Sequence, residues 1–325
     1  MDLLYPFKFY PMLKPKIWGG KKLELLNKDI SLLDNCGETW EICGLEESQS
    51  VISNGFLAGN EINELVETYM GDLVGEQVFE HFGNQFPLLF KFIDANDSLS
   101  VQVHPGDVLA AESHQSYGKT EMWYVVDADA DATLISGFSK PTTKEDYLIA
   151  LENKSLKDIL RVENVKEGDA FFIPAGRVHA IGSGVLLAEI QQTSDVTYRI
   201  YDWDRNDTDG KPRELHTEMA LGAIDFSMDE SNKIETKTEV NTTSKILACP
   251  YFVTNKVVFD MDVEKVYAAI DSFVVYMCLE GSYGIQYGSE LLQVNKGETV
   301  LIPAIMTEVV LIPNELTTLL EVYIP

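Results

Sequence analysis

The sequence predicts a mainly β protein made of two β-barrel domains, with helices inserted into the first. Two observations predict this class. Short apolar runs bounded by Gly, Pro and Asp, typical of barrels and sandwiches, dominate residues 86–135, 165–205 and 246–325. In addition, residues 166–175 (KEGDAFFIPA) resemble residues 295–304 (NKGETVLIPA), because each has a Gly-acidic turn, four apolar residues and Pro-Ala. Two copies of one β unit indicate duplicated domains rather than one large fold.

We expect the boundary between the two domains near residue 240. Residues 225–244 are polar, charged and rich in Thr, which is typical of a linker. The first domain, residues 1–240, contains the chemical motifs described below, and residues 241–325 form the second. Apolar spacing predicts helical insertions in the first domain at about 56–83, 141–161 and 212–224.

Local signals support each predicted helix. Apolar residues follow helical spacing behind Asn60, which we take as the N-cap of the first helix. Thr143 with Asp146 three residues later resembles a capping box for the second helix. The third helix is expected over residues 213–224, where Leu215, Ala220 and Ile224 are apolar.

Composition excludes several classes of partner. The chain has 25 Lys and Arg residues against 52 Asp and Glu residues, a net charge of −27, so it has no basic field with which to bind nucleic acid or anionic lipid. No apolar run approaches the roughly 18 residues that a membrane-spanning helix needs. The N-terminal residues do not resemble a signal peptide, and the four cysteines form no CxxC pair. We therefore expect a cytoplasmic protein with reduced thiols.

In the segment of residues 98–107, polar and apolar side chains alternate strictly from Ser98 to His104. In a strand Ser98, Ser100, Gln102 and His104 share one face, because successive side chains point to opposite sides. Gln102 and His104 then have the i, i+2 spacing that a metal would need from a strand. Taken alone, this segment favours a simpler interpretation, a surface strand with its polar face in solvent.

Two further segments favour a metal site. The pattern Gly168-x5-Pro174-x-Gly176-x2-His179 describes a turn, a strand and a second turn that delivers a histidine. Glu121 enters an otherwise apolar strand, where a carboxylate is costly to bury unless a cation pairs with it. Two imidazoles, one carboxylate and one amide oxygen would suit zinc or iron(II) and leave room for water or substrate.

These segments resemble a known family. The Gly-x5-Pro-x-Gly-x2-His segment is similar to the second motif of the cupin superfamily, and the ordered set of motifs resembles the short bacterial form of the type I mannose-6-phosphate isomerase family. The matching segments are residues 18–20, 37–41, 86–91, 99–105, 118–121 and 198–203. The resemblance implies two cupin (jelly-roll) barrels. The second barrel is expected to be degenerate and metal-free, since residues 246–325 contain no histidine.

The resemblance also implies roles for individual residues. It implies one Zn²⁺ per chain, with the ligands Gln102, His104, Glu121 and His179. The implied catalytic residues are the active-site arginine Arg199, the lysine Lys119 and the acid/base carboxylate Glu189. Substrate or phosphate binding is expected from Lys91, Ser100, Arg205 and Asp195. Glu189 has an equally acceptable structural interpretation, as a buried strand carboxylate paired with an arginine.

The implied reaction is the interconversion of mannose 6-phosphate and fructose 6-phosphate through a cis-enediol intermediate. Because the net charge of −27 opposes a sugar phosphate, local cations must reverse the sign of the field at the site. Two alternatives remain open at this point: a cupin iron(II) dioxygenase, since two His and a carboxylate also make a facial triad, and a non-catalytic sugar-binding cupin. The expected assembly is a monomer or homodimer.

Overall fold

The computed structural model describes residues 4–207, 209–227 and 231–325, and these form two β-barrels, each built from two antiparallel sheets. This confirms the predicted mainly β class. The seven-stranded sheet of the first barrel has the order β15 (Lys233–Ile234), β11 (Ala170–Ile173), β8 (Glu121–Ala128), β13 (Val185–Gln192), β6 (Leu88–Ala95), β3 (Glu38–Ile42) and β2 (Met12–Lys14). Its five-stranded sheet has the order β10 (Leu160–Asn164), β9 (Thr133–Phe138), β12 (His179–Ile181), β7 (Val101–Val103) and β14 (Tyr198–Tyr201).

The second barrel is likewise built from two antiparallel sheets. Its six-stranded sheet has the order β1 (Phe7–Lys8), β22 (Thr299–Ile302), β19 (Val274–Glu280), β24 (Thr317–Tyr323), β17 (Val253–Phe259) and β16 (Thr242–Ala248). Its four-stranded sheet has the order β18 (Val263–Val266), β23 (Glu308–Pro313), β20 (Ser282–Tyr287) and β21 (Glu290–Asn295). A separate ribbon joins β4 (Gly44–Leu45) to β5 (Ser48–Gln49).

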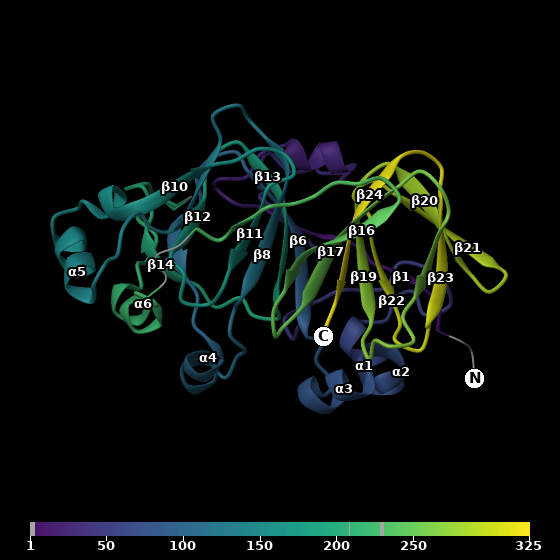
Figure 1. Ribbon diagram of the computed structural model, residues 1–325. Coiled ribbons are helices and arrows are strands. Elements are labelled where there is room, and N and C mark those ends of the chain that lie inside the picture. The colour runs from purple at the N-terminus through teal and green to yellow at the C-terminus, as the bar shows by residue number, and fades with distance from the viewer. Residues whose placement is uncertain (1–3, 208, 228–230) are drawn as a thin grey trace.

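Helices cover the ends of the barrels (Figure 1). They are η1 (Lys22–Leu26), α1 (Ile62–Tyr69), α2 (Gly71–Val74), α3 (Glu76–Phe82), α4 (Asp107–His114), α5 (Lys144–Glu152), η2 (Leu156–Ile159) and α6 (Thr217–Ala223). In Figure 1, α5 and α6 lie at the far end of the first barrel, and α1–α3 lie below the second. No helix in the described ranges combines the length and the apolar character needed to cross a bilayer.

The large sheets of the two barrels pack against each other through a shared core. On β13 the side chains of Leu186, Ala188 and Ile190 join this core, which also contains Leu320 and Val322 of β24. Successive strand residues point to opposite faces. The odd-numbered residues of β13, which include Glu189, therefore point into the interior of the first barrel.

The predicted duplication is visible in the backbone. Gly168 and Gly297 both adopt a left-handed conformation, with φ of 86° and 81°, which glycine reaches without steric cost. The amide of Gly168 donates to Val125 O (2.9 Å), and that of Gly297 donates to Cys278 O (2.8 Å). Each turn thus leads into a strand, β11 or β22, that pairs with the equivalent neighbour, β8 or β19.

The first described strand, β1, lies in the second barrel. Phe7 and Lys8 of β1 pair with Leu301 and Val300 of β22. The helices α1–α3 also contact this barrel, because Leu73 O accepts a hydrogen bond from Ala304 N (2.9 Å). The division at residue 240 stays a prediction, and β1, which precedes it, belongs to the six-stranded sheet of the second barrel.

Three predictions about local structure need correction. Glu61, not Asn60, is the N-cap of α1, because the Asn60 amide instead donates to Leu57 O (2.8 Å). The third helix is shorter than predicted: α6 spans Thr217–Ala223, and Leu215 is 45% exposed. The predicted linker contains β15, which pairs with β11. The Thr143–Asp146 capping box of α5 is confirmed.

Two helices of the described ranges were not predicted, the 3₁₀-helix η1 and the α-helix α4. Helix α4 (Asp107–His114) buries only Ala110, so its sequence lacks the apolar stripe that identifies an amphipathic helix.

Candidate active site

Four of the predicted site residues converge inside the first barrel. Gln102 on β7 pairs directly with His179 on β12, so their side chains lie on the same face of the five-stranded sheet. Glu121 begins β8 in the opposing sheet, and His104 follows the end of β7. The Gly176 amide donates to His104 O (2.9 Å), which ties the turn before His179 to the segment carrying the other histidine.

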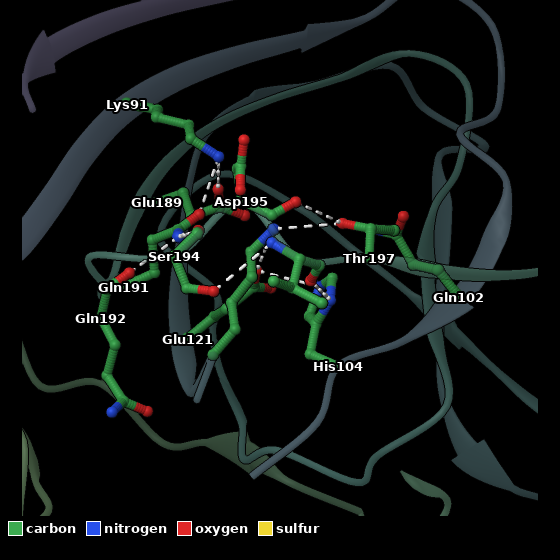
Figure 2. Close-up of polar contacts among 12 residues, drawn as sticks. Lys91, Gln102, His104, Glu121, Glu189, Gln191, Gln192, Ser194, Asp195 and Thr197 are labelled. Carbon is green, nitrogen blue, oxygen red and sulfur yellow. Dashed lines mark hydrogen bonds and ion pairs between the residues drawn. The ribbon is translucent and has the colours of Figure 1, made fainter. Parts of the chain in front are cut away.

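The donor atoms of this cluster lie at short range. His104 Nε2 is 3.2 Å from Glu121 Oε1, and His179 Nε2 is 3.8 Å from Glu121 Oε2. Gln102 Nε2 lies 3.3 Å from His179 Nε2. One donor atom from each of His104, Glu121 and His179 fits within a span of 4.8 Å. Figure 2 shows His104 and Glu121 side by side with Lys91 and Glu189 beyond them.

Backbone carbonyls orient the two imidazoles. His104 Nδ1 donates to Val196 O (2.9 Å), and His179 Nδ1 donates to Arg177 O (2.8 Å). Since a carbonyl can only accept, each ring carries its proton on Nδ1 and directs the Nε2 lone pair at Glu121. Burial lowers the pKa of both histidines, and the positive charge of Lys119 lowers that of His104 further. A lowered pKa favours the neutral ring, the form that a metal ligand must have, although the charge of Glu121 opposes the shift at His179.

The cluster fits a divalent metal ion. His104 Nε2 and Glu121 Oε2 are buried and have no hydrogen-bond partner in the protein. Leaving such groups unsatisfied is costly, and a cation between them would satisfy both. A half-turn of the Gln102 amide exchanges its nitrogen and oxygen and would present the oxygen to the ion. Nitrogen and oxygen donors in this number suit a catalytic metal site with an open position.

A cavity of about 260 Å³ opens beside the cluster. Its lining includes the predicted residues Lys91, Ser100, Gln102, Lys119, Glu121, Glu189, Asp195 and Arg199. It also includes residues to which the sequence analysis gave no role, namely Lys16, Trp18, Glu38, Ile93, Leu99, Ile181, Thr197 and Arg213.

Lys91 and Glu189 form a buried ion pair in one wall. Lys91 Nζ donates to Glu189 Oε1 (2.8 Å) and to Gln191 Oε1 (2.7 Å), and Trp123 Nε1 donates to Glu189 Oε2 (2.8 Å). Burial and the neighbouring Glu121 raise the pKa of Glu189, although Lys91 opposes this shift. Burial opposes the charge on Lys91, but the facing carboxylates raise its pKa overall. The structural interpretation of Glu189 therefore involves a lysine rather than an arginine.

Lys119 lies beside the cluster of His104, Glu121 and His179. Its Nζ is 3.6 Å from Glu121 Oε1 and donates to Thr197 Oγ1 (3.4 Å). Burial and the positive charge of Lys91 lower the pKa of Lys119. It therefore brings a desolvated amine to the edge of the metal cluster.

Of the two arginines predicted to act at the site, only Arg199 lines the cavity. Arg199 lines the cavity, donates from Nη1 to Glu214 O (2.8 Å) and leaves its buried Nε without a partner. Arg205 does not line the cavity and is bound instead to Asp202 (2.9 Å) and Asp97 (3.4 Å). Arg213 takes the place at the cavity that was expected of Arg205. Asp202 accepts from Arg213 Nε at 2.7 Å, which holds the guanidinium at the cavity wall.

Some of the cavity residues that were not predicted lie in or beside sequence motifs, and others do not. Glu38 lies inside the recognised segment 37–41, and Lys16 lies just before the recognised segment 18–20. Arg213 follows an irregular polar stretch with no periodicity, and nothing local marks it as a cavity residue.

Comparison with known proteins places this site in a family. Residues 7–131 match the family described as phosphomannose isomerase type I, catalytic domain. The chain is 36% identical to mannose-6-phosphate isomerase ManA of Bacillus subtilis over 92% of its own length and 93% of the relative. It is 33% identical to mannose-6-phosphate isomerase of Streptococcus mutans over 92% of each chain.

Structural similarity extends over the same length. The crystal structure of mannose 6-phosphate isomerase from Bacillus subtilis superposes with a TM-score of 0.88 and 30% identity, covering 98% of this chain and 99% of that one. Sequence and fold thus agree over both barrels, and the chain belongs to the type I mannose-6-phosphate isomerase family.

Proposed function

We propose that this protein is a zinc-dependent aldose–ketose isomerase that interconverts D-mannose 6-phosphate and D-fructose 6-phosphate. The observation that carries the proposal is the metal-ligand cluster of Gln102, His104, Glu121 and His179 at the wall of a cavity that also contains lysines and arginines. Family membership supports the reaction, and the donor set supports the metal.

The cationic side chains of the cavity divide into two groups. Lys91 and Lys119 lie close to the metal cluster, and Lys91 is already neutralised by Glu189. Arg213 and Lys16 also line a neighbouring cavity of about 300 Å³, so they mark the side away from the cluster. We assign the phosphate to Arg199, Arg213 and Lys16, and the C1–C2 end of the sugar to the cluster. Ser100 and Asp195 remain the proposed hydroxyl-binding residues.

Zinc bound by the four ligands would act as a Lewis acid that polarises the oxygens at C1 and C2 of the sugar. The protein's own task is then to move a proton between two carbons. A base removes the proton from C2 of the open-chain aldose, giving a cis-enediol(ate), and the same proton or a replacement is returned to C1. The hydroxyl proton at O2 is lost as the new carbonyl forms there, and O1 gains one.

Glu189 is the proposed base. Its raised pKa favours proton acceptance over permanent ionisation, as general-base catalysis near neutral pH requires. Lys91 holds Oε1 and Trp123 holds Oε2, so the carboxylate is fixed in orientation before the substrate arrives. We propose that Arg199 stabilises the negative charge of the enediolate and that Lys119 donates to a substrate oxygen next to the cluster.

An assay of mannose 6-phosphate conversion, coupled to detection of fructose 6-phosphate, tests the activity, and Glu189→Gln tests the base. We expect turnover in the wild type and a loss of about 10²-fold or more in kcat for Glu189→Gln, which matches the usual contribution of a general base. The metal content should stay at the wild-type level, because Glu189 is not a ligand. Near-wild-type kcat in Glu189→Gln would move the base to another residue.

The same preparations distinguish the two alternative functions. An iron(II) dioxygenase would contain iron and consume oxygen with its substrate, whereas a sugar-binding cupin would bind mannose 6-phosphate without converting it. The basic side chains Lys16, Arg199 and Arg213 favour a phosphorylated substrate over the apolar substrate of an oxygenase. We further propose a reducing, cytoplasmic setting, with which the four unpaired cysteines agree. One or two chains per active enzyme remains a prediction.

A further inference from the structure

The short segment that carries Lys119 into the active site is held from its outer side. The carboxylate of Asp107, the first residue of α4, accepts a hydrogen bond at Oδ1 from Gly118 N (2.9 Å). The same oxygen accepts from Gln192 Nε2 (2.9 Å), and Gln192 Oε1 accepts from Thr120 N (2.9 Å). Residues 118–120 are thus fixed on both sides of Lys119. Figure 2 shows the Gln192 side chain pointing away from His104 and Glu121.

The second barrel contributes the next contact in this chain. The hydroxyl of Tyr251 donates to Asp107 Oδ2 (2.6 Å). Tyr251 lies in the tight turn between β16 and β17, which is closed by a hydrogen bond from Cys249 N to Phe252 O (3.1 Å). Phe252 is fully buried in the core shared by the two barrels. Tyr251 itself is partly buried against that core, and its hydroxyl reaches Asp107 near the surface.

The contact between Asp107 and the 118–120 segment requires a glycine at position 118. A Cβ built on Gly118 would lie 2.7 Å from both the backbone nitrogen and Oδ1 of Asp107. The absence of a side chain at this position allows the carboxylate to reach the backbone. Lys119 N in turn donates to Pro105 O (3.1 Å), next to His104. A displacement of Asp107 would thus be passed to Lys119 and, two residues on, to Glu121.

We propose that Tyr251 and Asp107 are positioning residues through which the second barrel fixes Lys119 at the active site. The proposal rests on the proposed function, in which Lys119 contacts the substrate. Neither residue lines the cavity, so both act through the 118–120 segment. Hydrogen bonds to a carboxylate are about twice as strong as neutral ones, and small displacements of a catalytic group cost large factors in rate.

The test compares Tyr251→Phe with the wild type in steady-state kinetics on mannose 6-phosphate. We expect kcat to fall about threefold to tenfold with a smaller change in KM, because the ligands and phosphate-binding arginines are untouched. Zinc content should not change. Tyr283→Phe is the matched control: it removes a buried hydroxyl of the second barrel that has no hydrogen-bond partner, and should keep the wild-type kcat.

A second experiment distinguishes an effect through Lys119 from a general loss of protein stability. In a Lys119→Arg background the lysine geometry is already lost, so adding Tyr251→Phe should reduce kcat less than twofold further. Asp107→Ala should lower kcat by about tenfold or more, and Asp107→Asn should recover part of that loss because it can still accept from Gly118 N.

Two results would overturn the proposal. One is an unchanged kcat in Tyr251→Phe, whatever the result for Asp107→Ala. The other is a loss for Tyr251→Phe that is equally large with and without Lys119→Arg. An inactive wild type would instead refute the proposed function and is distinguishable from both.

Discussion

Asp94 shows how strongly its surroundings set the behaviour of one buried carboxylate. Its Oδ2 accepts from Lys22 N (2.6 Å), but its Oδ1 is buried without a partner. Burial is the largest influence and raises its pKa from 3.8 to about 6. The ionised form of Asp94 is therefore a cost to the folded state at neutral pH.

This cost predicts a dependence of stability on pH. Between the unfolded pKa of 3.8 and the folded pKa of about 6, the folded protein binds more protons at Asp94. The stabilisation from this protonation is therefore lost as the pH rises through that window. Asp94→Asn should gain about 1–2 kcal/mol relative to wild type between pH 4 and pH 7, after allowing for solvent screening. Urea unfolding at both pH values measures the difference, and parallel pH profiles would contradict it.

Arg213 and Arg205 form a natural pair for testing the phosphate assignment, since both bind Asp202 but only Arg213 lines the cavity. We expect Arg213→Met to raise KM for mannose 6-phosphate by about tenfold to a hundredfold, the usual effect of a lost charge-assisted hydrogen bond. Arg205→Met should change KM by less than about threefold, because it alters the same carboxylate without contacting the substrate. Equal effects of the two substitutions would contradict the assignment.

For single residues, the sequence predicted the candidate metal ligands better than the residues that hold or pair with the other cavity side chains. His104, Glu121 and His179 stood in local patterns whose residue types signal metal chemistry. Arg213 did not, because its position depends on an ion pair to Asp202, a contact between residues with no shared periodicity. Likewise the Lys91 partner of Glu189 is set by the register of β6 against β13, which the sequence does not display.

Among the elements, α5 is the one whose signals and structure agree most closely. Thr143 Oγ1 accepts from Asp146 N (3.1 Å), and Asp146 Oδ2 accepts from Thr143 N (3.0 Å), so both partners satisfy free helix-end groups. We expect Thr143→Ala to lower the free energy of unfolding by about 1 kcal/mol, the usual value of an N-cap. Because α5 lies at the far end of the first barrel, kcat should not change (Figure 1).

Thermal unfolding and kinetics on the same samples check this prediction. Thr307→Ala, at an exposed position outside any helix, is the control and should leave the stability unchanged. A Thr143→Ala protein as stable as the control would show that the capping box contributes nothing.

Helices and strands were predictable where their own residues carry the pattern. The capping box and the repeated Gly-acidic turns are local features, and both are present in the structure. Helix α4 and strand β15 are not local features. The first buries only Ala110, and the second exists because it pairs with β11 far away in the sequence.

Over the whole molecule, the two barrels have a row of equivalent cross-strand positions that are occupied by partly different residues. In the first, Glu189 on β13 stands between Lys91 and Trp123 on the neighbouring strands. In the second, Glu321 on β24 stands between Asn255 and Tyr276. The buried carboxylate is retained in both.

The proposed metal ligand Glu121 is not retained in the second barrel. Glu121 pairs with Ile173, whereas the equivalent partner of Ile302 is Val274. The similarity between the two barrels thus extends beyond the repeated ten-residue segment, to the buried glutamates Glu189 and Glu321. The chemical difference between the barrels arises from substitutions around a common framework.

The shared core predicts that the barrels unfold together. Phe7 of β1 is fully buried in that core, yet it lies at the start of the chain and pairs with β22. Phe7→Ala should lower the free energy of unfolding by about 3–5 kcal/mol in a single cooperative transition. Phe56→Ala, at a site that is 57% exposed, should have a much smaller effect. Two separate transitions, with only the second barrel destabilised, would contradict a common unfolding unit.

Zinc content measured alongside isomerase activity tests the central claim most directly. In the wild type we expect about one zinc per chain together with conversion of mannose 6-phosphate. In His104→Ala both should be lost, whereas His81→Ala, at an exposed histidine on α3, should keep both. Full zinc content in His104→Ala, or full activity in a wild-type protein shown to contain no metal, would contradict the account.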